Sequence, residues 1–340
     1  MRGAAAQTAA TGRSRPVAVR LPAAPNLQLA FLRAHPAYGA VETGGATWLA
    51  YQDRVGPRSL GWLEPGRDAQ IRAVGDPRVA ARVLQADLDL LPFDTLVAGL
   101  PASHPVRALH ARYRGVRAVL FADPLEGMCW TVLAQQVSVA AAAGIRRRIV
   151  DMFGEAVVGS GHPPLRSFPS AEVLAGLDTE ALRLAGVSRQ KAATLLRLAR
   201  MRLRGWDVER IRRLPASAAL EELDAVPGIG PWSAEYALVR VFGHRDVLPA
   251  GDVGLRRAWG RVADLGAAAT EEELRRAGDE LIGWRSLFAF YLWLENAAPR
   301  MGERADSRPR QESRPRHRSY LASAPQTGAS RERIGGHDGA

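Results

Sequence analysis

Hydrophobic and polar positions alternate in two different ways along the chain. Residues 17–95 hold short apolar runs of the kind that form strands, separated by Gly, Pro and Asp turn signals. These runs lie at 17–21, 47–52, 59–64 and 69–73. A helical pattern from Pro77 to Leu91 follows them. This first part therefore predicts a small sheet with one or two helices.

From about residue 104 onward, apolar residues recur at helical spacing. The expected helices span 104–114, 124–138, 140–153, 170–176, 178–185, 188–203, 207–212, 216–225, 232–242, 253–263, 270–280 and 284–297. Gly- and Pro-bearing breaks separate them, as at 160–164 and 227–231. We therefore predict a mostly α fold with a small α+β N-terminal domain.

The two ends of the chain lack periodicity, and this sets the expected domain limits. Residues 1–16 are predicted to form a disordered leader, and the Arg-, Ser- and Pro-rich residues 300–340 a disordered basic tail. Between them we expect an α+β domain over 17–103 and a helical domain over 104–299. No apolar run reaches the ~20 residues of a membrane helix, and no apolar signal segment stands out.

A net charge of +11 favours a polyanionic partner. The first 16 residues hold three arginines and no acid, and residues 300–340 hold nine arginines against five acids. Because the ends carry most of the excess, charge leaves nucleic-acid binding open. A single cysteine, Cys129, allows no internal disulfide and no four-cysteine metal or iron–sulfur site. A single cysteine fits a protein of the reducing cytoplasm.

The most informative stretch is a tight hairpin between two helical patterns. Pro227-Gly228-Ile229-Gly230-Pro231 separates the pattern over 216–225 from the one that begins at Trp232. Its glycines permit positive φ, and amide groups at the start of the second helix can meet an anion, helped by the helix dipole. A DNA phosphate is the natural ligand, and the loop carbonyls could hold a monovalent cation. The alternative is an ordinary helix–helix turn.

Asp252 follows Trp232 by twenty residues, just before the helical pattern that begins at Val253. Aspartate is among the best N-cap residues, so Asp252 could simply cap this helix. Capping and catalysis are compatible, because a cap at a helix start can face a cleft.

A helix, a PGIG hairpin, a second helix and then a loop that ends in an aspartate follow one another along this chain. This arrangement resembles that of the helix-hairpin-helix DNA glycosylases. The resemblance is to the DNA-3-methyladenine glycosylase II (AlkA-type) branch, and three further segments share it: VLAQQVSVAAA (132–142), LAGVSRQKAATLLRLA (184–199) and WRSLFAFYLWL (284–294). It covers roughly 17–297 and is strongest from 124. It implies a helix-hairpin-helix glycosylase bundle acting on double-stranded DNA with damaged bases, as a monomer, away from membranes.

The resemblance also implies roles for individual residues. Asp252 takes the position of the essential carboxylate, which stabilises positive charge on the sugar as the base leaves. Trp232, Tyr236 and Trp293 would form an aromatic pocket for a flipped, electron-poor base, although core packing is the alternative for each. Gly228, Ile229 and Gly230 would bind the DNA backbone. Gln136 would wedge into the duplex gap, with a polar helix terminus as the alternative.

Two absences separate this chain from related glycosylases. Relatives that also cut the strand place a lysine two residues after the last hairpin glycine, where this chain has Trp232. Lys191, in a different segment, is the only lysine and could contact phosphate or lie on a solvated helix face. Other relatives carry a four-cysteine iron–sulfur cluster. We therefore expect a monofunctional enzyme without a metal or cluster that leaves an abasic site.

A second function class stays open, namely a helix-hairpin-helix protein that binds DNA without cutting it. Asp252 argues against this reading, because a carboxylate beside a phosphate-binding loop repels DNA unless it has a role there.

Overall fold

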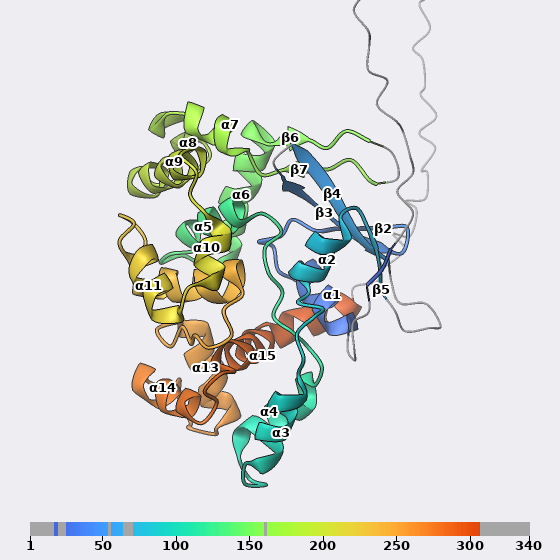
Figure 1. The fold of residues 1–340 in the computed structure, drawn as a ribbon, viewed down its shortest axis with the longest axis vertical. Helices are drawn as coiled ribbons and strands as arrows, with labels where there is room; N and C mark the ends of the chain where they lie inside the picture. Colours follow the sequence, from blue (N-terminus) through green and yellow to red (C-terminus); the bar gives the residue numbers. More distant parts are fainter. Residues whose placement is uncertain (1–16, 20–24, 54–55, 64–70, 160–161, 307–340) are drawn as a thin grey trace, which may run out of the picture.

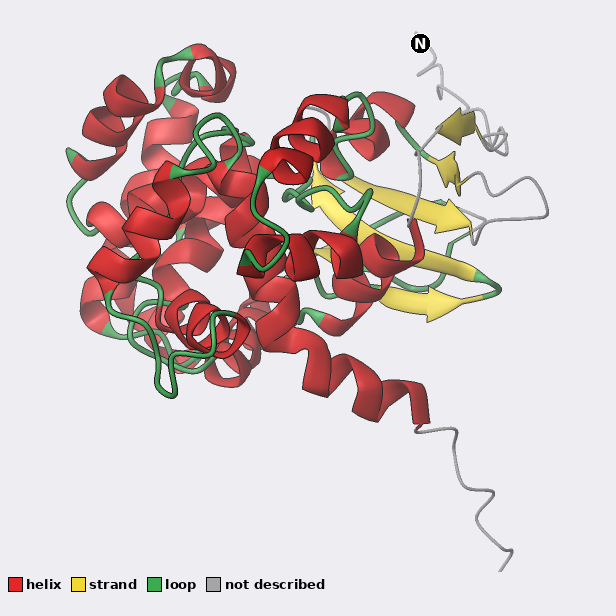
Figure 2. Ribbon diagram, turned by 90° about the horizontal axis from the view of Figure 1, so that it is seen from below, coloured by secondary structure: helices red, strands yellow, loops and turns green. Residues whose placement is uncertain are grey.

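A computed structural model describes residues 17–19, 25–53, 56–63, 71–159 and 162–306. It has an antiparallel sheet on one side and a group of helices on the other (Figures 1 and 2). The proposed leader, 1–16, lies outside the described residues, as does 307–340 of the proposed tail.

The sheet has the strand order β1-β5-β4-β3-β2 and is antiparallel throughout. Its strands are β1 (Val17–Val19), β2 (Val41–Thr43), β3 (Ala46–Gln52), β4 (Pro57–Leu63) and β5 (Ile71–Val74). The central pair is β3 with β4, in a register that places Leu49 opposite Leu60. Four of these strands match the predicted runs. The sequence prediction omitted β2, a three-residue edge strand whose side chains are exposed.

Helices make up most of the rest of the molecule. In chain order they are α1 (Pro25–Ala34), α2 (Pro77–Val83), α3 (Leu91–Gly99), α4 (Pro105–Tyr113), α5 (Pro124–Leu133), α6 (Val139–Phe153), α7 (Ala171–Gly176), α8 (Thr179–Leu184), α9 (Arg189–Leu203), α10 (Val208–Arg213), α11 (Ala216–Asp224), α12 (Pro231–Ala237), the π-helical turn η1 (Leu238–Phe242), α13 (Val253–Val262), α14 (Glu271–Asp279) and α15 (Arg285–Asp306). A two-stranded ribbon, β6 (Glu155–Ala156) with β7 (Arg166–Ser167), follows α6. The mostly helical fold with a small N-terminal sheet is confirmed.

Three predicted helix limits are wrong. The helix predicted from Pro77 to Leu91 ends at Val83, and Gln85 just beyond it has a left-handed backbone with φ of 47°. The helix predicted over 124–138 ends at Leu133, because Gln136 has a left-handed backbone with φ of 54° that no α-helix accommodates. The helix predicted over 284–297 continues to Asp306, beyond the predicted limit of the helical domain at 299. Trp293 therefore lies within α15 and not at its end.

The two predicted domains share one hydrophobic core. Phe31 of α1 packs edge-on against Phe290 of α15, with ring centroids 4.9 Å apart, and the two helices lie side by side in Figure 1. The side chain of Gln28, also on α1, donates to the carbonyl oxygens of Leu84 and Arg117, each at 3.1 Å. The same core holds Trp62 of β4 and Trp130 of α5, both almost fully buried. The N-terminal sheet is thus joined firmly to the helices that carry the candidate site.

No helix in the described ranges is both long enough and apolar enough to cross a membrane.

Candidate active site

The hairpin joins α11 to α12 and depends on a glycine at its tip. Gly228 has φ of 97°, and a Cβ atom placed there would lie 2.1 Å from Oγ1 of Thr194 on α9. Only glycine fits, both for its backbone angle and for this close approach. The neighbouring residue Ile229 turns its side chain into the core and donates its amide to the Val226 carbonyl at 2.9 Å.

The start of α12 leaves backbone amides without an acceptor among the described residues. Gly230 is the N-cap of α12 and provides no side chain for capping, unlike the Ser, Asp and Thr caps of most other helices. In the part of the chain that the structure describes, the amides of Gly230 and Trp232 donate to no protein oxygen. An anion can accept from these groups at the positive end of the helix dipole. Of the three hairpin residues predicted to bind DNA, Ile229 thus has its amide already engaged.

The hairpin is held from behind by side chains of α9 and of the segment after α5. Arg197 donates to the carbonyl oxygen of Pro227 at 2.6 Å. Gln135 donates to the carbonyl oxygen of Gly228 and to Oγ of Ser233, both at 2.9 Å. These contacts give Gln135 a structural role at the hairpin.

The candidate wedge, Gln136, follows directly and is exposed. Lys191 supports this turn, because its Nζ donates to the carbonyl oxygens of Leu133 at 2.9 Å and Gln135 at 2.7 Å. Lys191 therefore satisfies carbonyls at the end of α5. The sequence left a phosphate contact or a solvated helix face open for Lys191, and the structure adds these two hydrogen bonds to the end of α5.

Asp252 is the N-cap of α13 and also faces the aromatic residues. Its Oδ1 accepts from the amide of Leu255 at 3.0 Å, and its Oδ2 accepts from Nε1 of Trp232 at 3.3 Å. The side chain is partly exposed. One oxygen thus fixes the carboxylate to the helix start, while the other lies at the edge of the predicted pocket.

The three predicted pocket aromatics form one contiguous group. The ring centroids of Trp232 and Tyr236 lie 5.6 Å apart, and those of Tyr236 and Trp293 lie 5.4 Å apart. Tyr236 is buried, and its hydroxyl accepts from Nε1 of Trp130 at 3.1 Å. Burial raises the pKa of the Tyr236 phenol, which keeps it neutral. Trp232 and Trp293 are half-buried, so the exposed parts of these two indoles are where a base can stack.

Sequence reasoning did not identify three residues around this group. Trp130 anchors Tyr236 from α5. Asn296 lies next to Gly254, where an added Cβ atom would be 3.1 Å from Nδ2 of Asn296 and 3.0 Å from Oδ1 of Asp252. Arg240 packs behind the rings, with its guanidinium carbon 5.9 Å from the ring centroid of Tyr236 and 5.4 Å from that of Trp293. None of them follows a recognisable spacing, because each reaches the site through packing of distant segments.

Arg256 and Arg257 follow the aspartate and differ in role. Arg256 donates to the carbonyl oxygen of Ala269 at 2.7 Å and so fixes the loop before α14. Arg257 is exposed and available to a phosphate.

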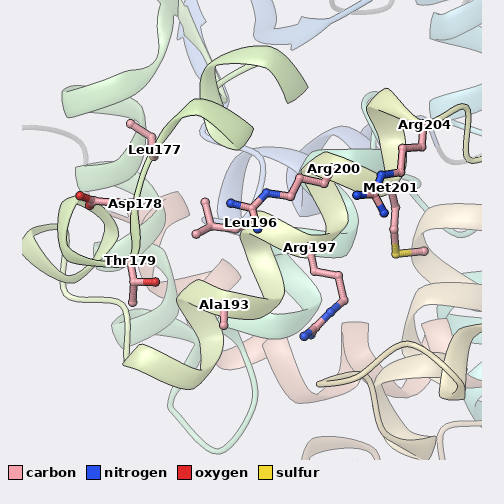
Figure 3. A pocket seen from close by; sticks show the side chains of 9 residues that line it. All are labelled: Leu177, Asp178, Thr179, Ala193, Leu196, Arg197, Arg200, Met201 and Arg204. Carbon is pink, nitrogen blue, oxygen red and sulfur yellow. The ribbon is translucent and has the colours of Figure 1, made fainter.

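A hollow of about 490 Å³ lies elsewhere, between α9 and the loop that joins α7 to α8. Figure 3 shows three α9 arginines among its lining residues, Arg197, Arg200 and Arg204. It contains neither Asp252 nor the three aromatics. Among the described residues, no group of His, Cys, Asp and Glu side chains is placed to hold a metal ion.

The known proteins that this chain resembles are DNA repair enzymes. The HhH-GPD superfamily model, described as base excision DNA repair protein, matches residues 129–283. A DNA-3-methyladenine glycosylase of Bacillus subtilis is 28% identical over 61% of this chain and 67% of its own. A probable bifunctional transcriptional activator/DNA repair enzyme AlkA of Mycobacterium tuberculosis is 34% identical over 61% of this chain but only 40% of its own. The solved 3-methyladenine DNA-glycosylase of Archaeoglobus fulgidus superimposes with a TM-score of 0.71 at 25% identity, over 83% of this chain and 98% of that one.

The chain therefore belongs to the HhH-GPD superfamily of base excision DNA repair proteins. Within that superfamily it falls in the DNA-3-methyladenine glycosylase II, or AlkA-type, branch.

Proposed function

We propose that this chain is a monofunctional DNA glycosylase that hydrolyses the N-glycosidic bond of alkylated bases in double-stranded DNA. The observation that carries the proposal is the position of Asp252, whose Oδ2 accepts from the indole N–H of Trp232 at 3.3 Å beside the hairpin. A carboxylate that accepts from an indole N–H, close to amides that can donate to a phosphate, suits cleavage of a base from a sugar in DNA. The names of its relatives support the same activity.

In this mechanism the hairpin amides hold a phosphate while the damaged nucleotide leaves the base stack. The base stacks on the exposed parts of Trp232 and Trp293, whose electron-rich faces attract a cationic alkylated ring. The C1′–N bond then breaks, and the bonding electrons leave with the base. Asp252 stabilises the positive charge that develops on the sugar, and a water molecule adds to C1′ while its proton passes to the carboxylate or to solvent.

The position of the only lysine supports hydrolysis over strand cleavage. Strand-cutting relatives attack the sugar with a lysine amine, whereas Nζ of Lys191 donates to two carbonyls at the end of α5. We expect an abasic product that is cut only after alkali treatment. A monovalent cation at the hairpin would share the carbonyl oxygens of Pro227 and Gly228 with Arg197 and Gln135, which each donate one hydrogen bond there. The monomeric state and the cytoplasmic location stay predictions.

The test is Asp252→Asn, assayed on a duplex containing 7-methylguanine. Asparagine also caps helices well, so α13 stays intact, whereas Asp252→Ala would cost about 1 kcal/mol of stability. We expect base release to fall at least 100-fold, with duplex affinity kept or increased because a negative charge is removed near the backbone. Release at the wild-type rate would refute the role of Asp252. A wild-type chain that releases no base would favour the non-catalytic DNA-binding alternative.

A further inference from the structure

Arg240 is a buried guanidinium directly behind the candidate base pocket. It lies on η1, the π-helical turn that continues α12, and its side chain is 1% exposed. Its Nε donates to the carbonyl oxygen of Val119 at 3.0 Å, and a terminal nitrogen donates to the hydroxyl of Tyr38. No carboxylate in the described residues lies within ion-pair distance of it.

Aromatic rings provide most of its surroundings instead. The guanidinium carbon lies between 5.1 and 5.9 Å from the centroids of five rings: Phe31, Tyr38, Tyr236, Phe290 and Trp293. Each such contact attracts a cation, and the attraction is stronger in a site without water. Within the described part of the chain, neutral groups thus surround the charge of Arg240, without a paired counter-ion.

Two of the five rings are pocket residues, so Arg240 and Asp252 lie at opposite ends of one aromatic group. Arg240 lies 5.4 Å from the ring of Trp293 and 5.9 Å from that of Tyr236. On the other side, Tyr236 contacts Trp232, whose N–H reaches Asp252. Both charges act on the Tyr236 phenol, because Arg240 lowers its pKa and Asp252 raises it.

This arrangement matches the direction in which charge moves during excision. When the C1′–N bond breaks, its electron pair stays on the base, and the sugar becomes one unit more positive. A base alkylated at a ring nitrogen passes from cationic to neutral, and an unalkylated base such as hypoxanthine passes from neutral to anionic until a proton from solvent neutralises it. In both cases a fixed cation behind the base favours the change, while Asp252 favours the charge on the sugar.

Resting on the glycosylase function above, we propose that Arg240 determines the substrate range of the pocket. Its buried charge draws the bonding electrons toward the departing base and so allows release of bases that are neutral in DNA, while it weakens binding of bases that are already cationic. Arg240 acts through Tyr236 and Trp293 and touches no substrate, so it is a positioning residue of the pocket.

The test compares Arg240→Met, which removes the charge, with Arg240→Lys, which keeps it. Single-turnover rates are measured on duplexes with 7-methylguanine and with hypoxanthine. Dissociation constants for both duplexes are measured in the Asp252→Asn background, where slow base release leaves the substrate intact during the titration. Thermal unfolding is followed for every variant, and Arg240→Gln replaces Arg240→Met should the latter fail to fold.

We expect Arg240→Met to slow release of both bases about tenfold or more, and to tighten binding of the 7-methylguanine duplex several-fold relative to the hypoxanthine duplex. Arg240→Lys should restore the rates and the wild-type ratio of affinities. An unchanged ratio of the two affinities in Arg240→Met would overturn the inference. So would equal losses of release rate in Arg240→Met and Arg240→Lys that parallel their losses of thermal stability. Either result would leave the glycosylase function intact. A wild-type chain that releases neither base would overturn both.

Discussion

The indole N–H of Trp232 points at the carboxylate of Asp252, with Nε1 of Trp232 3.3 Å from Oδ2 of Asp252. The two residues are brought together by the hairpin helix α12 and by the start of α13. Because Oδ1 of the same carboxylate accepts from the amide of Leu255, the side chain is fixed at both oxygens. A single residue of the predicted pocket therefore both offers a stacking surface and orients the candidate catalytic group.

The first prediction concerns this bond. Trp232→Phe keeps an aromatic face but removes the N–H, so the carboxylate loses one of its two donors. We expect the single-turnover rate of base release to fall about tenfold, the lower end for a hydrogen bond to a charged group, with unchanged affinity for abasic duplex. Trp232→Ala removes the stacking surface as well and should cost more in both quantities. A wild-type rate in Trp232→Phe would show that the bond does not orient Asp252.

Much of this site is predictable from the sequence because its geometry is local. Gly228 and Gly230 lie in a short Pro/Gly segment between two helical patterns, which specifies a hairpin whatever surrounds it. Asp252 precedes a strongly amphipathic helix, which specifies an N-cap. The family resemblance then assigns Trp232, Tyr236 and Trp293, and in the structure Tyr236 contacts both tryptophans.

What the sequence does not predict depends on packing between distant segments. Arg240 has the appearance of an ordinary polar position on a helix, yet it is buried among rings that α1, α12 and α15 contribute. The end of α5 at Leu133 is equally hidden, since Ala134 and Gln135 are compatible with a helix. Only the left-handed backbone of Gln136 and the contact of Lys191 with the freed carbonyls define that end.

The second prediction separates two glycines of the hairpin. Gly228→Ala adds a methyl group 2.1 Å from Oγ1 of Thr194 at a φ of 97°, so we expect a loss of about 1–3 kcal/mol in stability together with weaker DNA binding.

At Gly230 an added Cβ atom has no neighbour within 4 Å, so Gly230→Ala should fold nearly as well as wild type. It should still bind duplex less tightly, because the methyl group obstructs a phosphate approaching the amides of α12. Denaturant unfolding and duplex titration measure both quantities, and a Gly230→Ala variant with wild-type affinity would argue against a phosphate at this position.

The third prediction concerns support of the wedge. Lys191→Met removes both donors to the end of α5, so the turn that presents Gln136 should loosen. We expect base release from duplex DNA to fall more than release from single-stranded DNA, because only the duplex needs a wedge to hold the gap open. Arg189→Met is the matched control, since it removes an exposed cation two residues away on α9 whose only ion pair in the described residues is a 3.9 Å contact with Glu180. If both variants lower the rate of release from duplex relative to single-stranded DNA by the same factor, the effect of Lys191 comes from its charge alone.

The last prediction is a pH dependence of stability that arises away from the site, at the start of α5. Burial raises the pKa of Asp123 from 3.8 to about 7, and the charge of Glu126 adds a smaller increase. Hydrogen bonds from the amides of Leu125 and Glu126 and the charge of Arg202 lower the pKa, but by less. A carboxyl group with a raised pKa in the folded state binds a proton more tightly there than in the unfolded state. Its contribution to stability is therefore fully present below pH 3.8 and is lost as the pH rises to about 7, with an upper limit of about 4 kcal/mol.

Asp123→Asn should remove this dependence while keeping the cap, because asparagine also accepts from the amide of residue 125. The wild-type free energy of unfolding should decline relative to that of the variant between about pH 4 and pH 7, and the two should run parallel above that range. Urea unfolding across this pH range measures the difference. Asp178→Asn is the control, because Asp178 caps α8 through the amide of Ala181 at 2.7 Å but is exposed. An Asp123→Asn profile that parallels wild type throughout would mean that Asp123 is charged in the folded protein and that α5 begins with a buried negative charge.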